Sequence, residues 1–304
     1  MSSAQGSQHQ TAFIKENLFG ITPDLPVFQK LRHNGFSGGL NRTQLVSAEL
    51  RSDRMISDMR LGNKQTSFEV PFEFSYGTFD ALLEGALFGT WNANVLQAGI
   101  TKSTFTMERY FSDIMQYIRH RGAVVDKFKL KLALDKMVEG SFAFVGNGDT
   151  ELAPTILAGA TYAEPTTTTP FDTFSGTILE GGVATAILTG VDFELDNGAQ
   201  AQHVLMAQLA DDINVKRSDL KGSVDLLFKN TTMYQKFVNE TPSSLQFTVT
   251  DGDNSYIFEI PRIKYTSVKV DVSGDGPVPL NMPFQALYDA ATGTNFRITR
   301  VPAV

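Results

Sequence analysis

The sequence predicts a mainly antiparallel β protein built from two similar halves. Apolar residues recur at every second position in most segments, which is the period of a strand with one buried face. Two short segments instead show helical spacing, and each directly follows a strand that ends in phenylalanine. Because the same order of expected elements occurs twice along the chain, we expect an internal duplication.

The expected strands alternate large apolar residues with polar ones. Residues 67–74 show the pattern most clearly, with a phenylalanine or valine at every even position. Successive side chains of a strand point to opposite faces, so each strand should place one face on a core. The apolar sets are Phe68, Val70, Phe72 and Phe74; Phe128, Leu130, Leu132 and Leu134; Val191, Phe193 and Leu195; Val224, Leu226 and Phe228; Tyr256, Phe258 and Ile260; and Val268, Val270 and Val272.

Two segments carry the apolar stripe of a helix that lies on a core. Residues 76–91 are expected to be helical, with Ser75 or Thr78 as the N-cap, and residues 230–240 are expected to be helical with Thr231 as the N-cap. Their apolar stripes are Phe79, Leu82, Leu83, Ala86 and Leu87 in the first, and Met233, Tyr234, Phe237 and Val238 in the second.

The repeated unit has the order strand, long polar loop, strand, helix, strand pair, strand. It runs through residues 45–144 and again through residues 188–284, with Phe74 and Phe228 at matching ends. Glycines, prolines and a threonine run interrupt the periodicity between the copies. We therefore expect a polar N-terminal arm at 1–16, a first domain at 17–150, a linker at 151–170 and a second domain at 171–304.

Charge and composition exclude several classes of function. The formal net charge is −7, whereas proteins that hold nucleic acid by neutralising phosphates need a clustered positive surface. The chain has no cysteine, which excludes disulfides, thiolate metal sites and cysteine nucleophiles. The first ten residues lack the apolar core of a secretory signal, and no apolar run approaches the roughly 18 residues that span a bilayer. Export and membrane insertion by these routes are disfavoured.

The sequence shows no recognisable catalytic or metal-binding motif. None of the histidines has a second histidine or a carboxylate at metal-binding spacing, and the nucleophile elbow, the P-loop and the dinucleotide fingerprint are all missing. The DGDN turn at 251–254 resembles the start of a calcium loop but lacks the later bidentate glutamate. We expect a protein that is not an enzyme and that has no metal or cofactor.

Residues 51–64 (RSDRMISDMRLGNK) are the best candidate for a contact surface. The segment mixes charges with large apolar residues, and loops of this length are commonly functional or disordered. We expect an interface between subunits; the alternative is a hairpin that buries these residues in its own domain. The candidate residues are Arg51, Asp53, Arg54, Met55, Ile56, Asp58, Met59, Arg60 and Leu61. The counterpart in the second half, residues 197–222, is longer and contains Val204, Leu205, Met206 and Leu209.

Four stretches of the sequence carry a family resemblance: VSAELRSDR at 46–54, FSYGTFDALLEGALFGTW at 74–91, FDTFSGTILEGG at 171–182 and PFQALYD at 283–289. They resemble the tail tube proteins, also called major tail proteins, of long-tailed bacteriophages and related prophages. The likeness extends from about residue 17 to about residue 300, in the order of the family.

The resemblance implies a subunit of a stacked-ring tube in the virion tail, made in the host cytoplasm. Members have a β-sandwich or split-barrel domain with a flanking helix, and their inner sheets join into a continuous barrel on assembly. The implied partners are other copies, the tape measure protein, tail terminator and tail tip proteins, and double-stranded DNA that passes through the lumen without specific binding. In simpler members a loop between early strands reaches the neighbouring ring, and residues 51–64 occupy a comparable place.

The expected repeat also bears on the size of the ring. If each unit gives about four inner strands at about 4.8 Å spacing and about 40° tilt, six units enclose a bore of roughly 35 to 40 Å, and three units only roughly 15 Å. A DNA duplex of roughly 20 Å passes only the larger bore. We therefore expect a trimeric ring with pseudo-sixfold symmetry, with six chains per ring as the alternative.

Other functions stay open at the level of sequence. A carbohydrate-binding or adhesive β-sandwich of a virion or cell surface would need an exposed aromatic platform, and the single Trp91 lies at an expected helix end. An enzyme of unrecognised type would need a pocket with perturbed acids. The inner tube of a contractile tail and the tube of a gene transfer agent use related subunits.

Overall fold

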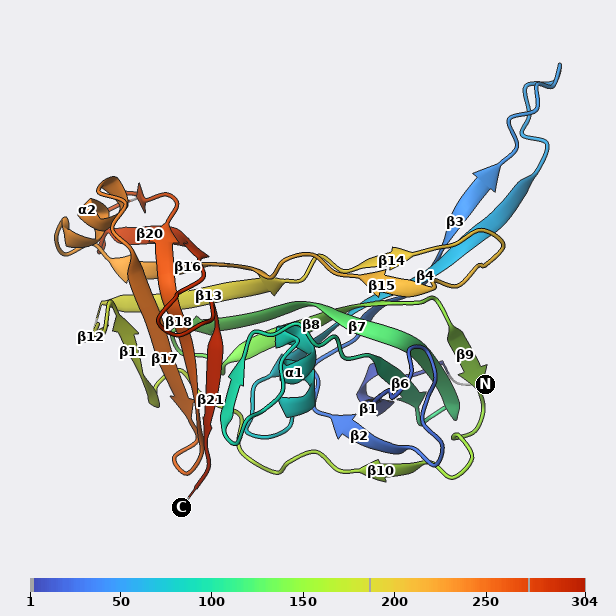
Figure 1. The fold of residues 1–304 in the computed structure, drawn as a ribbon, viewed down its shortest axis with the longest axis horizontal. Helices are drawn as coiled ribbons and strands as arrows, with labels where there is room; N and C mark the ends of the chain where they lie inside the picture. The colour runs from blue at the N-terminus through green and yellow to red at the C-terminus, as the bar shows by residue number, and fades with distance from the viewer. Residues whose placement is uncertain (1–2, 186, 273, 304) are drawn as a thin grey trace.

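Strands form most of the chain in the computed structural model, which describes residues 3–185, 187–272 and 274–303 (Figure 1). A short 3-10 turn, η1 (Gly6–Gln8), precedes the first strand. The two α-helices are short, and neither helix of the described residues has the length and apolar character needed to cross a membrane. The prediction of a mainly β fold is confirmed.

The first half of the chain forms two layers that share one long strand. The inner order is β3–β4–β8–β7 and the outer order is β10–β2–β1–β6–β7–β9. A bulge between Val125 and Lys127 lets β7 pass from the outer layer to the inner one. The strands are β1 (His9–Lys15), β2 (Val27–Leu31), β3 (Ser37–Val46), β4 (Met59–Glu73), β5 (Val95–Gln97), β6 (Phe105–Phe111), β7 (Gln116–Ala133), β8 (Glu139–Gly146), β9 (Thr150–Ala153) and β10 (Thr161–Ala163).

The second half pairs its strands in the same order. Its inner strands run β13–β16–β20–β18, and its outer strands run β12–β11–β17–β18–β21, with β5 of the first half added at the edge. The strands are β11 (Gly176–Glu180), β12 (Val183–Ala184), β13 (Leu188–Asp196), β14 (Gln200–Gln202), β15 (Asp212–Asn214), β16 (Asp219–Leu227), β17 (Ser243–Thr250), β18 (Ser255–Tyr265), β19 (Lys269–Val270), β20 (Pro279–Ala286) and β21 (Arg297–Val301). Strand β19 continues the place of β18 beside β20.

One sheet crosses from the first half to the second. Strand β7 pairs with β13 over seven residues, from Gly190 opposite Ala133 to Asp196 opposite Lys127. We call this pairing the intrachain seam. As a result, a single chain supplies eight neighbouring inner strands, in the order β3–β4–β8–β7–β13–β16–β20, followed by the β18–β19 segment.

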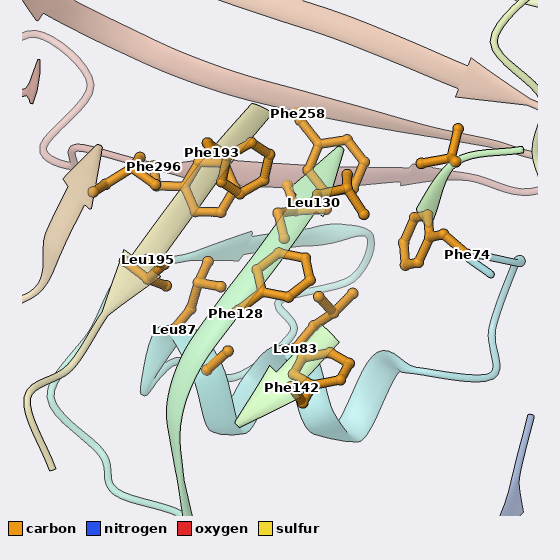
Figure 2. Close-up of a cluster of buried hydrophobic side chains, with 14 of the residues drawn as sticks. Phe74, Leu83, Leu87, Phe128, Leu130, Phe142, Phe193, Leu195, Phe258 and Phe296 are labelled. Carbon is orange, nitrogen blue, oxygen red and sulfur yellow. The ribbon is translucent and has the colours of Figure 1, made fainter. Parts of the chain in front are cut away.

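The two halves share a continuous apolar core. Figure 2 shows side chains of both halves together, with Phe128 of the first half between Phe142 of the same half and Phe193 of the second. Five of the six predicted strand stripes contribute buried residues to this core, as period-two alternation predicts, whereas Val268 and Val270 of the sixth are only half-buried against it. Leu134 and Val272, the last residues of two stripes, are exposed instead because the sheet does not cover them.

Both helices are shorter than the sequence predicts. The first, α1, spans Asp80–Leu87, and the second, α2, spans Thr232–Val238. The predicted N-cap of α1 is wrong: Phe79 is at that position, and Ser75 and Thr78 lie 3.1 Å apart, where their hydroxyls hydrogen-bond to each other. Thr231 is at the N-cap of α2, as predicted, but its side chain makes no capping hydrogen bond. Local hydrogen bonds between short polar side chains compete with capping, which explains the difference at α1.

The predicted N-terminal arm and linker contain paired strands. Residues 1–16 include β1, which pairs with β2 and β6 and buries Phe13. Residues 151–170 include part of β9, which pairs with β7, and β10, which runs parallel to β2. The division of the chain into two domains stays a prediction.

Three of the histidines gather around Arg109 in the outer layer of the first half. The Nδ1 atom of His9 lies 2.9 Å from Nε2 of His33, and Arg109 donates to His9 Nε2 at 3.2 Å. His120 is buried, stacks on Phe68, and has its Nε2 atom without a hydrogen-bond partner among the described residues. Burial, followed by the charge of Arg109, lowers the pKa of His120 to about 4.

This cluster should make the protein lose stability in mild acid. The unfolded chain takes up protons at these histidines near pH 6.5, whereas the folded chain resists protonation until about pH 4 for His120. The stabilisation is therefore complete above pH 6.5 and is lost as the pH falls towards 4. Urea unfolding at pH 7 and pH 5 should differ by about 2 kcal/mol through His120 alone. In His120→Gln the difference should shrink by that amount; an unchanged difference would count against this account.

Candidate assembly interface

Ion pairs reinforce the intrachain seam on its polar face. Lys127 contacts Glu194 at 2.8 Å and Asp196 at 2.9 Å, and Lys129 contacts Glu194 at 3.2 Å. Three lysines of β7, Lys127, Lys129 and Lys131, lie directly opposite the three acids of β13, Asp196, Glu194 and Asp192. Opposite charges in such cross-strand pairs stabilise a sheet and set its register.

The ion pairs shift the pKa values of Glu194 and Lys127 in the direction that favours their charged forms. Burial would raise the pKa of Glu194, but hydrogen bonds from Lys127 and Lys129 outweigh it, and the pKa is lowered. Hydrogen bonds to Glu194 and then Asp196 raise the pKa of Lys127. These shifts favour the charged forms of Glu194 and Lys127, so this pair stays ionised at neutral pH.

Both ends of the inner sheet are open. Strand β3 pairs with β4 on one side, and β19 pairs with β20 on one side; within the described ranges neither has a second strand partner. An edge strand presents a row of free N–H and C=O groups on which another strand can add. We call residues 37–41 of β3 and residues 267–271 around β19 the open edges.

Strands β3 and β4 extend beyond the body as a long hairpin, which we call the β3–β4 arm (Figure 1). Its tip, residues 47–58, lies far from the core, and Leu50, Met55 and Ile56 are exposed there. The predicted contact residues all lie on this arm, with Met59, Arg60 and Leu61 in the first part of β4. The alternative, burial of the apolar residues in their own domain, is contradicted by the exposure of Met55, Ile56, Met59 and Leu61.

The corresponding connection in the second half forms a separate hairpin of β14 and β15, which we call the β14–β15 arm. It lies across the first half and reaches the root of the β3–β4 arm (Figure 1), where the Lys64 N–H donates to the Gln208 carbonyl at 2.7 Å. Its tip leaves Leu205 and Met206 exposed, while Ile213 is buried against the first half. The sequence shows the apolar residues but not this contact, because the contact joins distant segments.

The inner sheet has one apolar face on the core and one polar face. The polar face has a hollow of about 770 Å³ lined by Glu69, Glu139 and Lys131 among others. Four of its six lysines contact carboxylates. The charged residues of this face are Glu69, Glu73, Glu139, Asp192, Glu194, Asp196, Asp219 and Asp225, and Lys127, Lys129, Lys131, Lys221, Lys264 and Lys269.

These features define a mainly β protein with open sheet edges and projecting arms. Within the described part of the chain, no group of three or more histidine, aspartate or glutamate side chains has the arrangement to hold a metal ion. A family model described as phage tail tube protein matches residues 6–286. The chain belongs to this family, as the sequence resemblance predicts. No curated protein matches it.

Membership of the family gives the general role of the protein. It has a structural role in a phage tail tube, and the family implies association of copies into a tube and a place in the virion tail. The family match does not assign roles to individual residues, so an interface at residues 51–61 stays a proposal.

Proposed function

We propose that three copies of this chain close into a ring, and that stacked rings form the conduit of the tail. The observation that carries the proposal is the intrachain seam: one chain joins two four-stranded inner sheets into eight neighbouring strands with both ends open. Three such chains supply about 24 strands, which at about 4.8 Å spacing and about 40° tilt enclose a backbone diameter of about 48 Å.

The polar face of the inner sheet suits the wall of such a conduit. Its carboxylates outnumber its lysines, and most of the lysines are paired. DNA binds tightly where free cations neutralise its phosphates and release counterions. A wall with few free cations lets the duplex pass without gripping it, and the same bore holds the tape measure protein before ejection.

The arms serve the contact between rings. The described residues of the chain leave the apolar tip of the β3–β4 arm exposed, and exposed apolar clusters commonly mark interaction sites. In the proposed tube the arm of one ring lies on the neighbouring ring. At the two ends of the tube, the same surfaces meet the tail terminator and tail tip proteins.

Electron microscopy of purified protein tests the proposal. The protein, concentrated and then aged, should form hollow rods of constant width with a bore of roughly 35 to 40 Å. Assembly should depend steeply on concentration because each ring needs several copies. A protein that stays monomeric at all concentrations would contradict the proposed function.

A further inference from the structure

The two halves of the chain pair their inner strands in the same order, so equivalent residues of the two halves can be identified. Strands β4, β8 and β7 correspond to β16, β20 and the β18–β19 segment, because they pair in the same order. Val70 lies opposite Phe142 in the first half, and Val224 lies opposite Met282 in the second. Strands β3 and β13 hold equivalent places beside β4 and β16.

The register of the intrachain seam transfers residue by residue. Lys129 and Lys269 are equivalent, since they lie opposite equivalent residues of β8 and β20, and Glu194 and Gly39 are equivalent beside β16 and β4. Glu194 lies opposite Lys129 at the intrachain seam. We infer that Gly39 of one copy lies opposite Lys269 of the next, with residues 37–41 antiparallel to residues 267–271. This inference rests on the proposed function, and we call the pairing the interchain seam.

Apolar residues on the open edges support a second copy as the missing partner. Leu40 is 42% exposed, whereas its equivalent Leu195 is 1% exposed. Val272 is 74% exposed, whereas its equivalent Leu132 is 7% exposed. Leu195 and Leu132 are buried at the intrachain seam. The interchain seam would bury their equivalents, Leu40 and Val272, in the same way. Pairing would place Leu40 opposite Val268 and Phe36 opposite Val272.

The two seams differ in charge. At the equivalent positions the interchain seam has Ser37, Gly39 and Asn41 in place of the three acids of β13. Within the described residues, Lys269 has no carboxylate in ion-pair contact. The interchain seam therefore relies on backbone hydrogen bonds and apolar contacts alone. The intrachain seam therefore stays paired at all protein concentrations, whereas the interchain seam forms at high concentration and dissociates at low concentration.

Disulfide cross-linking tests the register, and the chain has no cysteine that could interfere. In the double variant Asn41→Cys with Ser267→Cys, the two thiols should meet only between copies. Oxidised rods should then give covalent dimers and trimers on a denaturing gel without reductant. The control Ser37→Cys with Ser267→Cys is four residues out of register, about 13 Å along the strand, which is too far for a disulfide. Equal cross-linking of both variants would overturn the register.

A charge substitution tests the difference between the seams. Gly39 has open space where a Cβ would lie, so Gly39→Glu should fold normally and place a carboxylate opposite Lys269. We expect the critical concentration for rods to fall about two- to five-fold, as for an exposed ion pair, and the gain to disappear in high salt. Adding Lys269→Glu should reverse the gain, and Gly39→Lys with Lys269→Glu should restore it.

The outcomes separate this inference from the proposed function. Hollow rods from the unmodified chain, without cross-linking of Asn41→Cys to Ser267→Cys, would overturn the register and leave the tube intact. A gain in Gly39→Glu that persists with Lys269→Ala would overturn the proposed charge contact. If the unmodified chain forms no rods, the proposed function fails and this inference fails with it.

Discussion

Replacing Leu50 and Ile56 with serine is expected to prevent rods from forming at concentrations that assemble the unmodified chain. Both residues lie at the tip of the β3–β4 arm and are 99% and 71% exposed. Burying two such side chains against a neighbouring ring contributes about 3 to 6 kcal/mol per chain, and each ring makes the contact several times. The loss should therefore raise the critical concentration by several orders of magnitude. Sedimentation and electron microscopy of aged samples measure it.

A matched control separates this effect from a general loss of surface apolarity. Ile100 and Leu152 are 96% and 73% exposed and lie outside both arms, so Ile100→Ser with Leu152→Ser removes similar side chains. This control should assemble like the unmodified protein. Neither double variant should change the free energy of unfolding by more than about 0.5 kcal/mol per site. Normal rods from the arm variant would show that the arm tip does not join rings.

Phe142→Ala is expected to lower the free energy of unfolding by about 3 to 5 kcal/mol. Phe142 is fully buried on β8 and lies next to Phe128 (Figure 2). Its ring centroid is 5.0 Å from that of Phe128 and 5.0 Å from that of Phe72. Removing the Phe142 side chain leaves a cavity between β4, β8 and β7. The neighbouring aromatic side chains cannot fill this cavity, because the sheet holds them in place. Chemical unfolding of the soluble chain measures the change.

The exposed Phe174 provides the comparison for Phe142. Phe174→Ala removes the same atoms without opening a cavity, so stability should change by less than about 0.5 kcal/mol. Because a typical domain has only about 5 to 15 kcal/mol of stability, Phe142→Ala should also unfold a measurable fraction of the chain near 37 °C. Equal effects of the two substitutions would contradict the assigned core.

Period-two alternation predicts the faces of the inner strands well, because burial of one face is a local property of a strand. Phe68, Phe72 and Phe128 all lie on the core face, as the pattern predicts. The alternation of Lys127, Lys129 and Lys131 with apolar residues is equally visible in the sequence. The sequence does not show that β13 is the partner strand of this segment, since their pairing joins residues about 60 positions apart and depends on the whole sheet.

Other features depend on contacts that a sequence pattern does not contain. Strand β1 has few large apolar residues. Backbone pairing with β2 and β6 holds it in place, and no stripe of apolar residues marks it in the sequence. The start of α1 differs from prediction because Ser75 and Thr78 bond to each other. The exposed positions of Leu134 and Val272 show that a stripe predicts a face but not what covers it.

Symmetry-resolved electron microscopy of one assembled ring tests most directly whether a single chain provides two units of the tube wall. We expect three chains around the axis, each giving eight neighbouring inner strands, with β3 of one copy beside β19 of the next. Six chains around the axis, or rings in which these two strands stay uncovered, would contradict it.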